Sequence, residues 1–114
     1  MRNDQAVLLD IDMAARRISG FVQGLTFEQF IADERTWSAV LYQVSVIGEA
    51  VKRLSDTFRA QHPSIPWTQM AGMRNKVIHG YDTVDFERVW ETVTVSVPEL
   101  RAALLPLISP DTPS

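Results

Sequence analysis

The most constraining feature of this 114-residue sequence is an apolar pattern that repeats in steps of three and four residues along most of its length. Such steps place side chains on one face of an α-helix, whereas a half-buried β-strand alternates every second residue. The pattern predicts a helix over residues 4–23, a short helix over 26–33 and the longest helix over 36–59. With the helices predicted below, it indicates an all-α fold, an antiparallel bundle of four to five helices.

Capping residues agree with the first boundaries. Asn3 or Asp4 can begin the first helix, because a short side-chain oxygen accepts a hydrogen bond from a free amide at a helix start. Gly24 is placed to end this helix. Thr26 and Gln29 have the spacing of a capping box, which predicts the start of the second helix.

The longest predicted helix carries two apolar stripes. The main stripe consists of Trp37, Val40, Leu41, Val44, Ile47, Gly48, Val51, Leu54 and Phe58, and the second of Ala39, Tyr42, Val46 and Ala50. A helix that is apolar on more than one face is usually packed between neighbours. In so short a chain we expect one neighbour to come from a second copy, so that the protein forms a homodimer.

Proline and glycine divide the second half of the chain. Two prolines make residues 62–66 a loop, and the later one, Pro66, suits the first position of a helix predicted over 67–79. Gly80 is placed to stop that helix, and residues 81–84 are predicted to form a short connector.

A last helix is predicted from its capping residue Asp85 to about residue 107. Its apolar positions keep helical spacing on both sides of residues 93–97, which alternate like a strand. Pro98 adds to the conflict, because proline removes an amide from a helix interior. We favour the helix over the strand and expect a kink near Thr94, one turn before the proline.

Composition limits the class of protein. Hydrophobic residues make up 46% of the chain and charged residues 22%, which is ordinary for a globular domain. The formal net charge of −3 argues against a broad surface that coats nucleic acid, although it leaves room for a small basic pocket. The absence of cysteine excludes disulfides and thiolate metal sites.

No apolar run approaches the ~20 residues of a membrane helix, and the first residues contain no apolar signal-peptide core. We therefore expect a cytoplasmic protein with no membrane partner. Residues 1–108 are expected to form one domain, and residues 109–114 a disordered tail.

Polar residues that helical patterning does not explain gather at the end of the helix predicted over 67–79. Asn75 and His79 are four residues apart and would share a helical face, whereas Arg74 lies about 140° around from His79. These groups could converge on one anion if the backbone turns at His79, before Gly80. However, basic residues near a helix C-terminus also complement the helix dipole without any function, and spacing alone favours that explanation.

The segment Arg74-Asn75-Lys76-Val77-Ile78-His79-Gly80-Tyr81 resembles the R-N-x-x-x-H-x-Y signature of HepT-like toxins in the HEPN superfamily. Upstream, Ile47-Gly48-Glu49-Ala50 is similar to the I-G-E-A segment of that family. The similarity covers nearly the whole chain in the order and length of its helices. It implies a HEPN-like bundle that dimerises and brings two copies of the motif to one composite cleft.

The resemblance also implies an activity, a partner and a set of site residues. The protein would be a metal-independent ribonuclease toxin of a type VII-like toxin–antitoxin pair, acting on RNA without a cofactor. Its antitoxin would be a small nucleotidyltransferase that silences it by adding AMP to the motif tyrosine. Carried over to this sequence, Arg74 and His79 would be catalytic, Asn75 supporting, and Tyr81 the modified residue.

The chemistry of these residue types agrees with that expectation. Metal-free RNA cleavage needs a base and an acid, and histidine titrates near neutrality. One chain offers one such histidine, His79, and a dimer would supply a second. Arg74 can hold a phosphate oxygen through two hydrogen bonds, Asn75 can orient His79 or bind the phosphate, and Lys76 adds a second cation.

No metal site is predicted, because Glu49, Asp82 and Asp85 show no recognisable ligand spacing near His79. Glu49 has two open explanations. It could pair with Arg74 or tune His79, or it could be a partly buried helix residue that pairs with an arginine four positions on, at residue 53.

Two further points stay open. Trp37, Trp67 and Trp90 could stack on bases, but helical spacing assigns Trp37 and Trp90 to the core and leaves Trp67 undecided, while His62 is expected to be an exposed loop residue. An alternative function is a non-catalytic helical partner that presents substrate to a nucleotidyltransferase, which the net charge of −3 favours. A plain dimerisation module without a site is a third.

Overall fold

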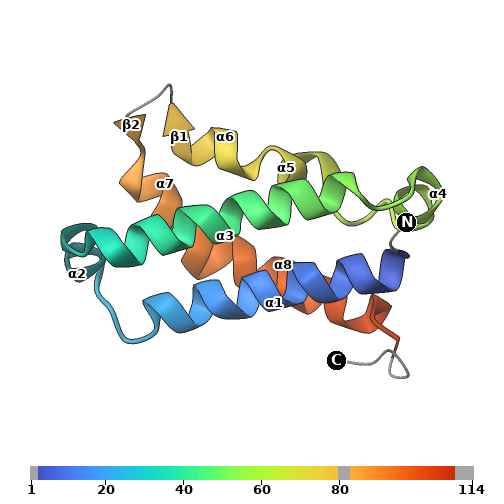
Figure 1. Ribbon diagram of the computed structural model, residues 1–114, viewed down its shortest axis with the longest axis horizontal. Helices are drawn as coiled ribbons and strands as arrows, with labels where there is room; N and C mark the ends of the chain where they lie inside the picture. Colours follow the sequence, from blue (N-terminus) through green and yellow to red (C-terminus); the bar gives the residue numbers. More distant parts are fainter. Residues whose placement is uncertain (1–2, 80–82, 110–114) are drawn as a thin grey trace.

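The computed structural model describes residues 3–79 and 83–109, whose secondary-structure elements are helices apart from one pair of two-residue strands (Figure 1). The α-helices are α1 (Asp4–Val22), α2 (Phe27–Ala32), α3 (Glu34–Lys52), α4 (Asp56–Gln61), α5 (Trp67–Ala71), α6 (Met73–Val77), α7 (Phe86–Glu91) and α8 (Val97–Leu104). The remaining elements are strands β1 (Ile78–His79) and β2 (Thr83–Val84), the π-helix η1 (Thr92–Ser96) and the 3-10 helix η2 (Leu105–Leu107). The predicted all-α fold class is confirmed.

The centre of the bundle is the antiparallel pair of α1 and α3 (Figure 1). Helix α8 packs on α1, whereas α5 and α6 lie along α3 on the side away from α1. The buried faces of α1 and α3 supply much of the core. Its most deeply buried side chains include Leu8, Ile11, Ile18, Phe30, Val44, Ile47, Val51, Met70, Val77 and Leu104.

The capping predictions for α1 and α2 are confirmed. Asn3 Oδ1 accepts a hydrogen bond from the amide of Ala6 at 2.8 Å. Gly24 follows α1 with φ +78°, a left-handed conformation that side chains disfavour. The Thr26 hydroxyl accepts from the amide of Gln29, and the Gln29 side chain accepts from the amide of Thr26, which completes the capping box.

The prediction of one long helix over 36–59 is wrong, because the chain breaks between α3 and α4. The amide and hydroxyl of Ser55 both donate to the carboxylate of Asp4 at 2.8 Å. Ser55 Oγ also accepts from the amide of Phe58 and so begins α4. The break ties the end of α3 to the start of α1 through a residue 51 positions away in the sequence.

Helix α3 also begins two residues earlier than predicted. Asp33 caps it by accepting hydrogen bonds from both the amide and the hydroxyl of Thr36. These bonds, the side-chain one first, stabilise the carboxylate and hold the pKa of Asp33 below its usual value.

The last helical segment begins at Asp85 as predicted, since its carboxylate accepts from the amide of Arg88. The strand alternative for residues 93–97 is wrong. The irregularity expected near Thr94 takes the form of the π-helix η1, in which the amide of Val97 reaches back to the carbonyl of Thr92. The wider turn accommodates Pro98, which has no amide to donate one turn back.

The crossing of α5 over α3 is close at Gly48. A Cβ atom at this position would lie 3.1 Å from the carbonyl oxygen of Ala71. On the α5 side, Trp67 and Met70 are buried against the core. The Trp67 indole donates to the carbonyls of His62 at 2.9 Å and Arg59 at 3.1 Å, so the loop 62–66 is held against α5 as well.

This crossing generates a stability prediction. Gly20→Ala, on an open face of α1 with nothing within 4 Å of the added Cβ, should raise the free energy of unfolding by about 0.5–1 kcal/mol. The free energy of unfolding of Gly48→Ala should be about 1–3 kcal/mol lower than that of Gly20→Ala, because α5 must move away from the added Cβ atom. Urea unfolding of both variants measures the difference. Equal stabilisation by the two substitutions would contradict the close crossing.

Candidate active site

Helix α6 is a single turn that separates two kinds of side chain. Met73 and Val77 are buried against α3 and α7, because they lie four residues apart on one helical face. Arg74, Asn75 and Lys76 occupy the remaining surface and are exposed to solvent. The two apolar residues therefore anchor the turn, and the three polar residues of the predicted motif project from it.

The backbone leaves the helix before His79, so the helix predicted over 67–79 is wrong in two places. It is interrupted at Gly72, between α5 and α6, and it ends at Val77. Ile78 and His79 form strand β1, which pairs antiparallel with β2 in the register Ile78 to Val84 and His79 to Thr83.

The short hairpin continues into the cap of α7. The amide of Asp85 donates to the carbonyl of Val77 at 2.8 Å, beside the strand pair. This bond and the ladder compete with further helical turns for the same backbone groups. The argument that Asn75 and His79 share a helical face is therefore wrong, and the backbone turn expected at His79 occurs one residue earlier, at Ile78.

The side chains of the three polar residues of α6 have no hydrogen-bond or ion-pair partner among residues 3–79 and 83–109. Arg74, Asn75 and Lys76 thus keep their side-chain donors free toward the described part of the chain. Two cations and an amide on one exposed turn can bind the oxygens of a phosphate group. The described backbone brings His79 directly after this turn, whereas Gly80 and Tyr81 lie outside the described residues.

Of the two explanations left open for Glu49, the partly buried helix residue paired with Arg53 is wrong. Its side chain is 65% exposed and pairs with Lys52 at 3.5 Å, one turn further along α3, rather than with Arg53. Within the described residues no ion pair joins Glu49 to Arg74. An exposed pair of this kind contributes little to stability. A supporting role of Glu49 at the site stays a prediction.

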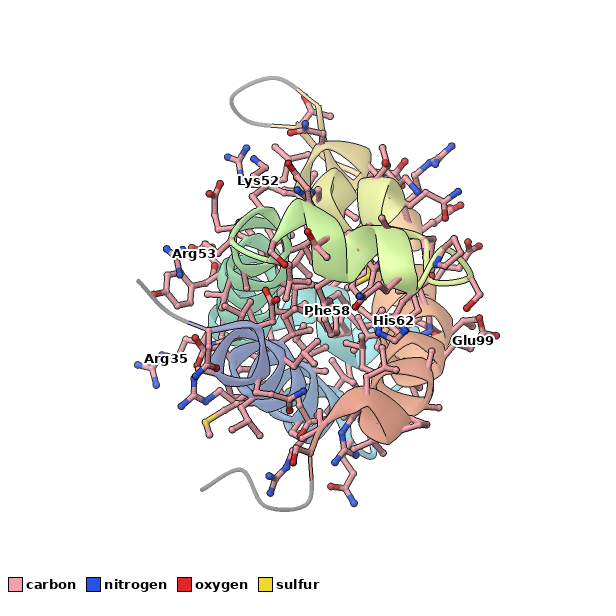
Figure 2. The ribbon with its side chains drawn as sticks, turned by 90° about the vertical axis from the view of Figure 1, so that its right-hand side faces the viewer. Arg35, Lys52, Arg53, Phe58, His62 and Glu99 are labelled. Carbon is pink, nitrogen blue, oxygen red and sulfur yellow. The ribbon has the colours of Figure 1, made fainter. Side chains whose placement is uncertain are left out.

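The tryptophans and His62 are structural. Trp67 is 8% exposed, Trp37 packs on Phe86 with ring centroids 5.2 Å apart, and Trp90 packs on Phe30 at the same distance. His62 is half-buried rather than exposed. Its ring centroid lies 4.7 Å from that of Phe58, and Figure 2 shows the two side chains beside each other.

A pocket beside α6 was missed by the sequence analysis. Lys76 lines it from the motif turn, and Thr92, Ser96 and Glu99 line it from the π-helix η1 and from α8. The only sequence signal was the conflict between the alternating residues 93–97 and Pro98. That conflict was interpreted as a question of secondary structure and not of a site.

The part of the chain that the structure describes contains neither a candidate metal site nor a candidate membrane-spanning helix. No group of three or more histidine, cysteine, aspartate and glutamate side chains is arranged to hold a metal ion. No described helix is long and apolar enough to cross a membrane.

Comparison with known proteins decides the family. Residues 11–107 match the family model described as ribonuclease HepT-like. The chain belongs to this family. The resemblance inferred from the motif segment and from the I-G-E-A segment is confirmed, and the match extends from α1 to η2.

The alignments with similar proteins cover most of this chain and most of each relative. A Thermococcus cleftensis protein named "Probable ribonuclease HepT" is 40% identical over 100 residues, covering 88% of this chain and 91% of its own. A "Putative RNase" of Caldanaerobacter subterraneus is 42% identical over 80 residues, 70% of this chain and 71% of its own. A "Putative RNase" of Methanocaldococcus jannaschii is 39% identical over 94 residues, 82% and 78% of the two chains. No solved structure matches.

Proposed function

We propose that this HepT-like protein is a metal-independent endoribonuclease. The observation that carries the proposal is the exposed turn of α6, where the side chains of Arg74, Asn75 and Lys76 have no partner in the described structure and His79 follows in β1. Relatives at about 40% identity are named as ribonucleases, which supports the same substrate class.

The proposed reaction is transfer of a phosphodiester to its own ribose. A base removes the proton of the 2′-hydroxyl, whose oxygen attacks phosphorus, while an acid gives a proton to the departing 5′-oxygen. The products are a 2′,3′-cyclic phosphate end and a free 5′-hydroxyl. His79 would serve in proton transfer, and Arg74 would hold the phosphate oxygens as their charge increases. Asn75 and Lys76 would orient the same phosphate.

The shortage of histidine supports a composite site. Two proton transfers are served best by two groups, but each motif contains one histidine. A symmetric dimer would bring a second His79 to the cleft. The second apolar stripe of α3 is only partly covered within one chain, since Tyr42 is 67% exposed and Val46 is half-buried. This uncovered surface supports the dimer as part of the proposal.

Regulation by a partner enzyme completes the proposal. The protein would act as the toxin of a type VII-like pair, and a nucleotidyltransferase antitoxin would transfer AMP to the hydroxyl of Tyr81, with pyrophosphate as the leaving group from ATP. The added phosphodiester would place negative charge beside Arg74 and Lys76. It would then compete with RNA for those cations and block the cleft.

The ribonuclease proposal predicts cleavage in the presence of EDTA. The purified protein should cut RNA and leave 2′,3′-cyclic phosphate or 3′-phosphate ends. His79→Ala should lower the rate by about 10²–10⁴-fold, as expected for loss of proton transfer. His62→Ala is the matched control, since it changes the other histidine of the chain, and its activity should persist. Inert wild-type protein, or cleavage that needs a divalent metal, would contradict the mechanism. Tight binding to a nucleotidyltransferase by an inert protein would favour the non-catalytic partner instead.

The composite site predicts complementation between inactive chains. Arg74→Ala and His79→Ala should each be inactive alone, the former by about 10²–10³-fold. In a mixture, exchanged dimers should regain part of the activity, because their shared cleft then holds an intact Arg74 from one chain and an intact His79 from the other. Sedimentation measured together with the assay gives the oligomeric state. A fully active monomer would end the proposal of a shared site.

The regulatory proposal predicts selective modification of one tyrosine. After co-expression with the neighbouring nucleotidyltransferase, mass spectrometry should find AMP on Tyr81 and none on Tyr42, although Tyr42 is 67% exposed. Ribonuclease activity should fall with the extent of modification. Tyr42→Phe should remain silenced by the partner, and Tyr81→Phe should escape. Silencing that persists in Tyr81→Phe would show that the partner acts by occlusion.

A further inference from the structure

A pocket of about 240 Å³ lies where α5 and α6 face the π-helix η1 and α8. Met70, Met73 and Leu100 form its apolar wall, and Lys76 together with Glu99 lies among its polar residues. Figure 2 shows Glu99 projecting from the α8 side of the molecule, opposite Lys52 and Arg53 on the α3 side. The pocket is therefore separate from the exposed ion pair of α3.

The π-helix supplies the most deeply placed polar group of this pocket. Thr92 is 9% exposed and lines the pocket, and its hydroxyl has no hydrogen-bond partner among the described residues. Thr94, two positions along the same π-helix, instead donates to the carbonyl of Trp90 at 2.6 Å. This hydroxyl is therefore available to donate a hydrogen bond to, or accept one from, a ligand that enters the pocket.

The rest of the lining also offers unused hydrogen-bonding groups. Lys76 and Glu99 line the same pocket, yet no ion pair joins them within the part of the chain that the structure describes. Ser96 adds a second hydroxyl from the π-helix. Donors and acceptors beside methionine and leucine side chains suit a ligand with an apolar face and a polar edge.

We propose that this pocket binds one nucleobase of the RNA substrate. A base is planar, presents hydrogen-bonding groups along its edge, and packs its face on apolar side chains. The volume of about 240 Å³ lies below the ~300–1,000 Å³ of pockets for drug-sized ligands, which favours a single ring system. Lys76 belongs to both the motif turn and the pocket, so a base bound there lies beside a cation that can hold its phosphate. The inference rests on the proposed ribonuclease function.

Ligand binding without turnover tests the pocket. The full chain, labelled with ¹⁵N, is titrated with AMP, GMP, CMP, UMP and, as a control without a base, ribose 5-phosphate. At least one nucleotide should bind about fivefold or more tightly than ribose 5-phosphate, the low end of what a base contact contributes. Its amide shifts should include η1 and α8. Nucleotides that bind no better than ribose 5-phosphate would show a phosphate site only and overturn the inference.

Substitutions on α8 provide a matched comparison. Ala103 lines the pocket, whereas its exposed neighbour Ala102 does not. Ala103→Phe should fill the pocket and remove the advantage of the nucleotide over ribose 5-phosphate, and Ala102→Phe should leave it unchanged. Thr92→Val should weaken the preferred nucleotide, with Thr94→Val as its control on the same π-helix. Equal effects of the members of each pair would overturn the inference.

The outcome separates this inference from the ribonuclease proposal. Wild-type protein that cleaves RNA but shows no preference for nucleotides over ribose 5-phosphate would retain the ribonuclease function and remove the base pocket. Wild-type protein that binds nucleotides at η1 and α8 but leaves RNA intact would retain the base pocket and remove the ribonuclease function. Where both hold, Ala103→Phe should alter the base preference at the sites of cleavage, and Ala102→Phe should not.

Discussion

The close crossing of α5 over α3 at Gly48 is the constraint on which the rest of the structure depends. With the carbonyl of Ala71 3.1 Å from the position of a Cβ atom, no larger residue fits at this point without displacing α5. Gly72 follows at once, and the chain restarts as α6 with Met73 and Val77 buried. The glycine on α3 therefore lets the end of α5, from which α6 continues, lie close to α3.

Beneath this crossing, polar contacts between distant residues hold α1 to the rest of the bundle. Asp4 binds Ser55 after α3, and Asp12 binds Arg101 on α8 at 2.7 Å. Gln5 donates to the carbonyl of Leu107 at 3.0 Å, near the end of the described chain. These bonds act at the margins of an apolar core, where they fix the register of helices that could otherwise slide along their stripes. These contacts thus tie the first half of α1 to the segments after α3 and to α8.

The arrangement explains how a chain with a net charge of −3 can be suited to an anionic substrate. The acidic residues are spread over the bundle, and several of them cap helices or pair with nearby cations. Arg74 and Lys76 stand together on one exposed turn without a described partner. In our proposal the phosphate binds there and the base enters the pocket beside Lys76, so a small cationic site replaces a broad basic surface.

Periodicity and capping in the sequence determined the helical class, the first three helix starts to within two residues, and the motif that identifies the family. They could not reveal the break at Ser55, which depends on Asp4 in another helix, or the end of α6 at Val77, which depends on pairing with β2. The pocket at Thr92 likewise needs α6 and η1 side by side. Local pattern specifies which face of a segment is buried, whereas only tertiary contacts decide where backbone groups exchange one partner for another.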